Sequence, residues 1–172
     1  MHINKLPKQP LICLQWPPKG RLGTVNLGYN LTYMNKNALT ASVEINQPIS
    51  LIWKIWNEPE HIIKWNAPSD EWINKKIENN LVEGGGFLYV MVKKDGTENF
   101  DFKGTYTEII EYERIAYTLD DDRKSLITFT GNNPVTLTEI FEPVANLDLT
   151  MQQEFCQSGL NQLKAYAEQL NK

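Results

Sequence analysis

The fold is decided by residues 151–170, which read MQQEFCQSGLNQLKAYAEQL. Within this stretch apolar or small side chains recur every three or four residues, and no proline interrupts them. This spacing places them on one face and predicts a single long amphipathic helix. The stripe consists of Met151, Phe155, Gly159, Leu163, Tyr166 and Leu170. Such a helix needs another element that covers its stripe.

The residues before this helix predict seven strands. The first shows an alternation of apolar and polar side chains, as in a half-buried strand. The other six are rich in β-branched and aromatic residues and are separated by short turns such as Asp95-Gly96. The predicted strands cover residues 39–46, 72–78, 87–93, 100–110, 114–119, 126–130 and 135–141. The connections between the last six are too short for helical crossovers, so we expect an antiparallel sheet.

Two short helices are predicted between the first two strands. Pro48 suits the first turn of a helix over residues 49–57, where apolar residues recur at spacings of three and four. Pro59 starts the second helix, over residues 59–66, and Pro68 closes it. The order of elements predicts an α+β domain, in which a curved antiparallel sheet of about seven strands wraps around the C-terminal helix.

The charge divides the chain into two parts. Residues 1–37 hold five basic and no acidic residues together with four of the nine prolines, and they show no sustained periodicity. We therefore expect an irregular, basic N-terminal extension over residues 1–37 and one domain over residues 38–172. A start at Met34 is an alternative, which would leave residues 1–33 outside the protein. The remaining part has 12 basic and 21 acidic residues, which argues against nucleic acid and anionic membranes as its partners.

Composition narrows the class of protein. With 41% hydrophobic and 22% charged residues the chain has the profile of an ordinary globular domain. It has no apolar run near the roughly 20 residues of a membrane span and no signal-peptide core, so we expect a cytoplasmic protein. Cys13 and Cys156 form no CxxC pair, which predicts free thiols rather than a zinc site or a disulfide.

Three motifs carry a family resemblance: WNEPEHIIKWN at residues 56–66, EGGGF at residues 83–87 and FKGTYTEI at residues 102–109. They resemble the family named after the activator of the heat-shock-protein-ninety ATPase. That family is part of the START-like (SRPBCC) helix-grip superfamily, which also includes polyketide cyclases and the birch-pollen allergen type. The resemblance runs from about residue 39 to residue 170. It implies a helix-grip fold with a cavity between sheet and helix that holds a small apolar or amphipathic molecule.

Aromatic residues supply the candidate lining of that cavity. On two neighbouring strands they crowd one face, and most of them are expected to form the core. Small side chains at Ser158 and Gly159, followed by Leu160 where relatives often place Trp, predict open space beside the helix. The candidate ligand-binding residues are Trp53, Trp65, Trp72, Phe87, Tyr89, Phe102, Tyr106, Phe155 and Gly159.

Other motifs indicate neither a metal nor a cofactor. His61 stands without the partner ligands or orienting base of a metal site or triad, and it is expected on a helix surface. Residues 84–86, a run of three glycines, lack the lysine and following helix of a phosphate loop, so they predict a turn. Residues 120–122, three aspartates, lack EF-hand spacing and predict a hairpin tip. Cys156 is expected to be a packed side chain.

A polar set comprising Asn66, Asp70, Tyr106 and Glu108 is the candidate for chemistry. If Asp70 were buried in the cavity, its pKa would rise and suit proton transfer. The alternative is that Asn66 and Asp70 satisfy backbone groups in a loop. Relatives often carry His shortly after the residue equivalent to Trp72, and Ile73 stands here instead, which weakens the acid–base hypothesis.

These patterns leave three hypotheses for the function. The first is non-enzymatic binding of a small apolar or amphipathic molecule, with a stress-related role included. The second is a cyclase-like or hydrolase-like enzyme that uses the same cavity. The third is a co-chaperone module, although the name-giving activators use an additional N-terminal domain that residues 1–37 are too short to replace. We expect a monomer or a weak homodimer.

Overall fold

The computed structural model describes residues 34, 36–67 and 69–170. The predicted extension and the alternative start at Met34 concern residues that lie almost wholly outside this range. The elements are β1 (Leu39–Ile45), α1 (Ile49–Asn57), α2 (Pro59–Trp65), β2 (Trp72–Asn79), β3 (Gly86–Lys93), β4 (Asn99–Ile110), β5 (Arg114–Leu119), β6 (Lys124–Thr130), β7 (Val135–Phe141) and α3 (Leu149–Gln169).

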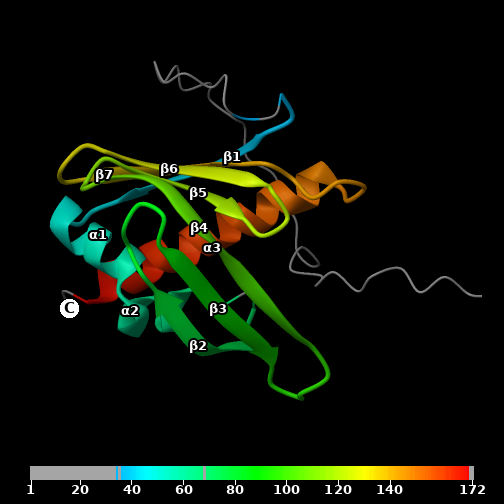
Figure 1. Cartoon of the computed structure of the whole chain (residues 1–172). Coiled ribbons are helices and arrows are strands. Elements are labelled where there is room, and N and C mark those ends of the chain that lie inside the picture. Colours follow the sequence, from blue (N-terminus) through cyan, green and yellow to red (C-terminus); the bar gives the residue numbers. More distant parts are fainter. Residues whose placement is uncertain (1–33, 35, 68, 171–172) are drawn as a thin grey trace, which may run out of the picture.

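All seven strands form one antiparallel sheet with the order β1-β7-β6-β5-β4-β3-β2. The last six strands are consecutive hairpins, and β1 pairs with β7 at the far edge. The sheet curls around α3, while α1 and α2 lie near the C-terminal end of that helix (Figure 1). The predicted α+β helix-grip fold is therefore confirmed, including the two short helices and the terminal helix.

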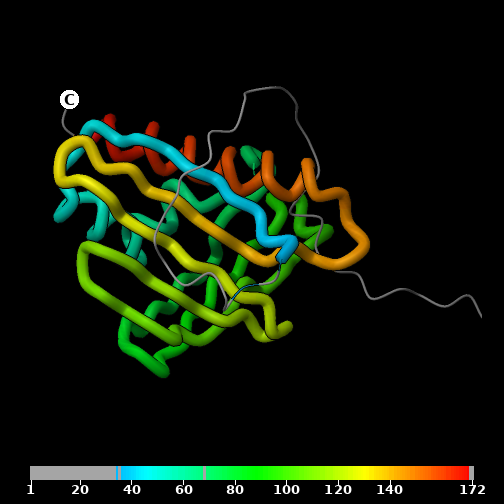
Figure 2. Tube along the Cα trace, turned by 90° about the horizontal axis from the view of Figure 1, so that it is seen from above, coloured from blue at the N-terminus to red at the C-terminus, as the bar shows by residue number. Residues whose placement is uncertain are grey.

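Helix α3 is attached to one edge of the sheet. Seen from above, α3 and β1 run side by side (Figure 2). Gln153 Nε2 donates to Thr40 O at 2.9 Å, and Gln157 Nε2 donates to Ser42 O at 2.8 Å. The Gln157 side chain also accepts from Ser42 N at 3.1 Å. These bonds satisfy backbone groups on the outer edge of β1, which would otherwise be an open template for another strand.

The buried face of α3 differs from the predicted stripe. The residues with the least exposure are Gln152, Leu160, Leu163 and Ala167, whereas Leu170, at the end of the predicted stripe, is 43% exposed. Attachment to the β1 edge rotates the helix by about one position relative to the prediction. The predicted stripe residues 155 and 159 are consequently half-buried and border open space.

The core lies between the C-terminal half of α3, the helix α1 and the strands at the β1 edge. Several aliphatic side chains in it have no exposed surface, among them Ile45, Ile115, Ile127, Val135 and Leu137. Burial of one such side chain contributes about 1.5–3 kcal/mol. A second, smaller cluster of Trp72, Met91 and Phe100 packs on the extended part of β2, β3 and β4.

Candidate functional site

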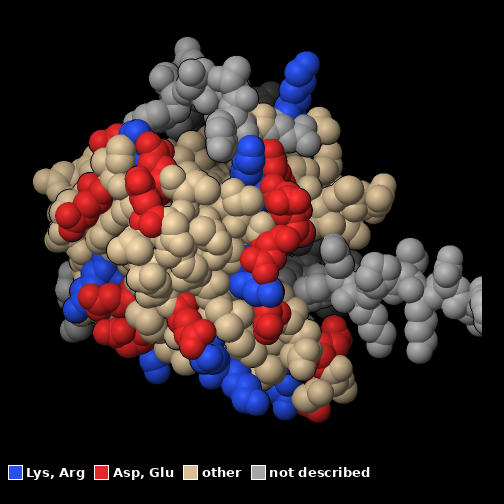
Figure 3. All heavy atoms as spheres, viewed as in Figure 1, with Lys and Arg blue, Asp and Glu red and all other residues tan. Residues whose placement is uncertain are grey.

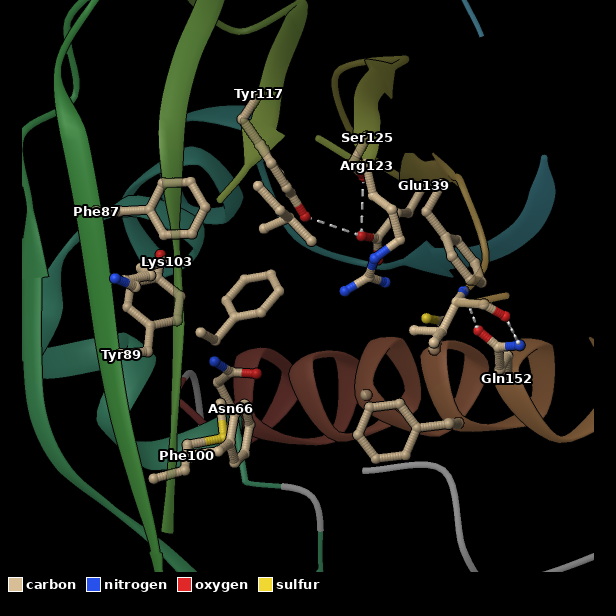
Figure 4. A pocket seen from close by; sticks show the side chains of 18 of the residues that line it. Asn66, Phe87, Tyr89, Phe100, Lys103, Tyr117, Arg123, Ser125, Glu139 and Gln152 are labelled. Atoms are coloured by element: carbon tan, nitrogen blue, oxygen red, sulfur yellow. Dashed lines mark hydrogen bonds between the residues drawn. The ribbon is translucent and has the colours of Figure 1, made fainter. Parts of the chain in front are cut away.

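A cavity of about 470 Å³ lies between the concave face of the sheet and the N-terminal half of α3. Its side chains come from α1 and α2, from β3 to β7, from the β7–α3 loop and from α3 (Figure 4). The deepest walls are aromatic, and charged residues stand at the mouth. The aromatic side chains that line it are Trp56, Trp65, Phe87, Tyr89, Phe100, Phe102, Tyr106, Tyr117, Phe141 and Phe155.

One wall is a cluster of tilted and edge-on rings on β3, β4 and β5. The Phe87 ring lies at its centre, 5.1 Å from Tyr117, 5.2 Å from Tyr106 and 5.5 Å from Phe102. Contacts of this kind each contribute about 0.5–1.5 kcal/mol beyond area burial. Gly104 on β4 makes room for the cluster, because a Cβ there would stand 2.5 Å from Thr118 O and 3.0 Å from the Phe87 ring.

The hydroxyl groups of this wall form a hydrogen-bonded chain. The Tyr89 hydroxyl donates to Tyr106, and Tyr106 donates to Asn79 Oδ1 at 2.6 Å. Asn79 Nδ2 in turn donates to Asn57 O at 2.7 Å. Burial raises the pKa of Tyr106 to about 12 and raises that of Tyr89. Both phenols therefore stay protonated near neutral pH and present a neutral wall.

The opposite side of the cavity carries a carboxylate. Glu139 on β7 accepts hydrogen bonds at Oε1 from Tyr117 at 3.3 Å and from Ser125 at 3.2 Å. Figure 4 shows both hydroxyls directed at this group. Burial raises the pKa of Glu139, although the two hydrogen bonds act in the opposite direction. The pKa of Tyr117 is also raised, first by burial and then by the charge of Glu139.

Helix α3 supplies the remaining wall. Phe155, Cys156 and Gly159 face the cavity and are half-buried. A Cβ added at Gly159 would meet no atom within 4 Å. Near the helix start, Gln152 Oε1 accepts from Val144 N at 2.7 Å, which fixes the loop that leads into α3. The helix thus leaves space beside Gly159 that the side chains of the described residues do not fill.

Paired charges surround the mouth. Lys103 Nζ lies 2.8 Å from Asp120 Oδ2, and Arg123 Nε lies 2.9 Å from Asp121 Oδ2. The hydrogen bond to Asp120 raises the pKa of Lys103. On the face shown in Figure 3, acidic and basic side chains are intermingled. Exposed pairs of this kind add little stability.

Comparison with known proteins assigns the chain to a family. The model of the family described as activator of Hsp90 ATPase homolog 1-like protein matches residues 46–170. The chain belongs to this family.

Two solved structures are similar to this chain in both sequence and fold. The AHSA1-like protein from Aeromonas hydrophila is 32% identical with a TM-score of 0.71, and the match covers 77% of this chain and 94% of that one. A protein from Cytophaga hutchinsonii is 38% identical with a TM-score of 0.70, covering 77% and 93%. A protein from Nitrosomonas europaea shares the fold at 18% identity, with a TM-score of 0.67 and coverage of 80% and 99%. A search of curated proteins gave no match.

Seven of the nine candidate ligand-binding residues line the cavity, and two do not. Trp53 packs instead against Phe129 and Tyr112, at ring distances of 5.2 and 5.6 Å, because it points from α1 toward β6 and the β4–β5 turn. Trp72 packs against Phe100 at 5.9 Å in the smaller cluster. The seven lining residues are Trp65, Phe87, Tyr89, Phe102, Tyr106, Phe155 and Gly159. Ligand contact for all nine stays a prediction.

The polar set proposed for chemistry is dispersed. Asp70 is exposed in the turn before β2 and does not line the cavity, so the burial on which its acid–base role depends is lacking. Glu108 binds Arg114 outside the cavity, at 2.8 and 2.9 Å, and this interaction lowers the pKa of Glu108. Asn66 and Tyr106 do line the cavity.

The other motifs have structural explanations. His61 is half-buried rather than a surface residue, because its Nδ1 lies 2.8 Å from the Tyr166 hydroxyl. The glycine run is a turn before β3, where Gly84 has a φ of 76° and a Cβ at Gly85 would stand 2.2 Å from Asn80 O. Residues 120–122 are the exposed β5–β6 turn. Among the residues described, no cluster of three or more His, Cys, Asp or Glu is arranged to hold a metal.

Sequence reasoning missed Glu139, Tyr117 and Ser125. The sequence does contain a signal for Glu139. Side chains along β7 point alternately to the two faces of the sheet, and Glu139 lies on the same face as the core residues Val135 and Leu137. An acidic residue on the apolar side of a strand is rare and predicts a buried carboxyl.

Across the part of the chain that is described, no helix combines the length and apolar character needed to cross a membrane.

Proposed function

We propose that this protein binds a small molecule with an aromatic or apolar body in the cavity between the sheet and α3. The observation that carries the proposal is the cavity of about 470 Å³ with aromatic walls and a few polar groups. Ligand sites typically enclose about 300–1,000 Å³ and have this kind of lining. Membership of a family with a START-like fold is consistent with such binding.

The open space beside Gly159 favours a binding site over an imperfectly packed core. A Cβ added at this position meets no atom within 4 Å, so a larger side chain would extend into the open space of the cavity. A cavity that binds nothing lowers the stability of the fold and serves no function. Retention of glycine in the middle of a helix also costs about 0.5–1 kcal/mol relative to alanine.

The experiment is a titration of the full chain with Nile red, a neutral apolar dye, followed by dye fluorescence. We expect saturable binding at micromolar concentration, and Gly159→Leu should weaken it at least tenfold because the new side chain occupies the cavity. Ser158→Leu is the matched control, since Ser158 is exposed on the same helix. The control variant should bind the dye as the wild type does.

Two outcomes would contradict the proposal. Absence of saturable binding by the folded wild type would favour the co-chaperone hypothesis, in which a surface rather than the cavity acts. Equal binding by wild type and Gly159→Leu would place the dye elsewhere on the protein. Native mass spectrometry of protein purified from its own host provides an independent measurement, in which a co-purified small molecule supports cavity binding.

A further inference from the structure

The inference concerns the carboxylate inside the cavity and rests on the proposed function. Glu139 is placed on the concave side of β7, in line with the fully buried residues Val135 and Leu137. Its Oε1 accepts hydrogen bonds from Tyr117 and Ser125, at 3.3 and 3.2 Å. Among the residues described, Oε2 has neither a hydrogen bond nor an ion pair, and it is not sealed from the cavity.

Desolvation of this carboxylate is costly unless a cation or a hydrogen-bond donor compensates. The Tyr117 and Ser125 hydroxyls donate to it, and Cys156, Arg123 and Lys124 also line the cavity. Arg123 is engaged by both carboxylate oxygens of Asp121, at 3.0 and 2.9 Å. Glu139 therefore has two neutral donors on one oxygen, and no cation within ion-pair distance among the described residues.

The surroundings favour a positive charge near this group. An ionised carboxylate accepts hydrogen bonds and donates none. The neighbouring rings of Tyr117 and Phe102, whose centroids are 6.3 Å apart, present π-faces or edges to the same space. Aromatic faces attract ammonium groups, most strongly where water is excluded. The described part of the chain is also net acidic, which raises the local concentration of cations.

We propose that the ligand carries a protonated amine on an aromatic body, and that this amine binds Glu139 Oε2 while the body lies against the Phe87 cluster. The cluster consists of Phe87, Tyr89, Phe102, Tyr106 and Tyr117. An amine supplies the missing donor and the missing positive charge together. A charge-assisted hydrogen bond of this kind is about twice as strong as a neutral one.

Three probes with one naphthalene body test the proposal: naphthylmethylamine, naphthylmethanol and naphthoic acid. At about pH 7 the first is a cation, the second is neutral and the third is an anion. Isothermal titration of the full chain should rank them amine, alcohol, acid. We expect the amine to bind about tenfold or more tightly than the alcohol.

Variants then assign the preference to one residue. Glu139→Gln should bring the affinities for amine and alcohol to within about threefold of each other, with the alcohol affinity nearly unchanged. Glu44→Gln is the control, because Glu44 is exposed on β1 and changes the net charge equally; it should keep the amine preference. Circular dichroism confirms folding, and the wild-type ranking alone decides the proposal if Glu139→Gln does not fold.

Failure of this inference is distinguishable from failure of the proposed function. If the naphthyl probes and Nile red all fail to bind, cavity binding itself is wrong. If they bind but the alcohol or the acid equals the amine, cavity binding stands and the amine-specific proposal is overturned. An amine preference that persists in Glu139→Gln also overturns it, because another group would then hold the cation.

Discussion

The two halves of α3 face the same sheet in different ways. In the C-terminal half, Leu163 and Ala167 have no exposed surface and pack into the aliphatic core. In the N-terminal half, Phe155 and Gly159 are half-buried and border a cavity of about 470 Å³. One helix thus contributes stability through one half and a candidate binding site through the other.

Hydrogen bonding does not explain this difference. The hollow half is held to β1 by Gln153 and Gln157, whose side chains bond the backbone of the edge strand. The explanation lies in side-chain volume and in sheet curvature. The sheet curls around α3 (Figure 1), and Gly159 supplies no side chain to fill the space beside the N-terminal half of the helix.

Truncation of one side chain in each half of α3 should give the largest difference in the free energy of unfolding. Leu163→Ala should lower the free energy of unfolding by about 2–5 kcal/mol, because it removes buried methyl groups and leaves a void in a closed core. Phe155→Ala should cost about 1 kcal/mol, since its ring already borders open space. Urea unfolding followed by circular dichroism measures both.

Comparable losses for the two variants would contradict the division of α3 into a packed half and a hollow half. The slope of the unfolding free energy against urea should stay the same in both variants. A changed slope would show that the substitution alters the compactness of one of the two states rather than a local contact.

The second expected effect is a pH dependence of stability. It arises from Glu139 on β7, a carboxyl group in the cavity beside the N-terminal half of α3. Burial raises the pKa of folded Glu139, so the folded state binds this proton more tightly than the unfolded state does. The contribution of Glu139 to stability therefore falls as pH rises from the ordinary carboxyl pKa, about 4, through the raised folded value. Glu139→Gln removes this loss.

Thermal unfolding of Glu139→Gln and wild type across that pH window measures the effect. The stability of the variant relative to wild type should increase with pH, while Glu44→Gln should show no such trend because Glu44 is exposed. A difference between Glu139→Gln and wild type that is independent of pH would mean that Glu139 titrates like a solvated side chain.

The sequence was sufficient for the fold because its signals are local. Alternation along residues 39–46, turns such as Asp95-Gly96 and prolines at helix starts each report backbone geometry that neighbouring residues set. Every predicted helix and strand is present, with bounds that differ by at most two residues. The half-barrel then follows, because an antiparallel sheet and one long amphipathic helix bury their apolar faces together.

The site was harder to predict because it depends on long-range placement. The helix face was predicted about one position away, because the rotation of α3 depends on contacts with distant parts of the chain, such as the bonds from Gln153 and Gln157 to β1. Trp53 was grouped with the cavity residues on aromatic character alone, and its direction from α1 takes it toward Phe129. Glu139 can be recognised as a site residue only when the face of β7 on which it lies is considered together with the position of the cavity.

The smallest effect concerns the one residue that makes the hollow half hollow. Gly159→Ala should raise the free energy of unfolding by about 0.5–1 kcal/mol, because alanine loses less backbone entropy in a helix interior and its methyl group meets no atom within 4 Å. The methyl group occupies little of the cavity, so Nile red should still bind within about threefold of the wild-type affinity. Chemical denaturation and dye titration of the same preparation measure both quantities. A loss of stability would mean that the helix packs more closely at this position than the open space beside Gly159 indicates, and the contrast between the two halves of α3 would then be smaller than the structure suggests.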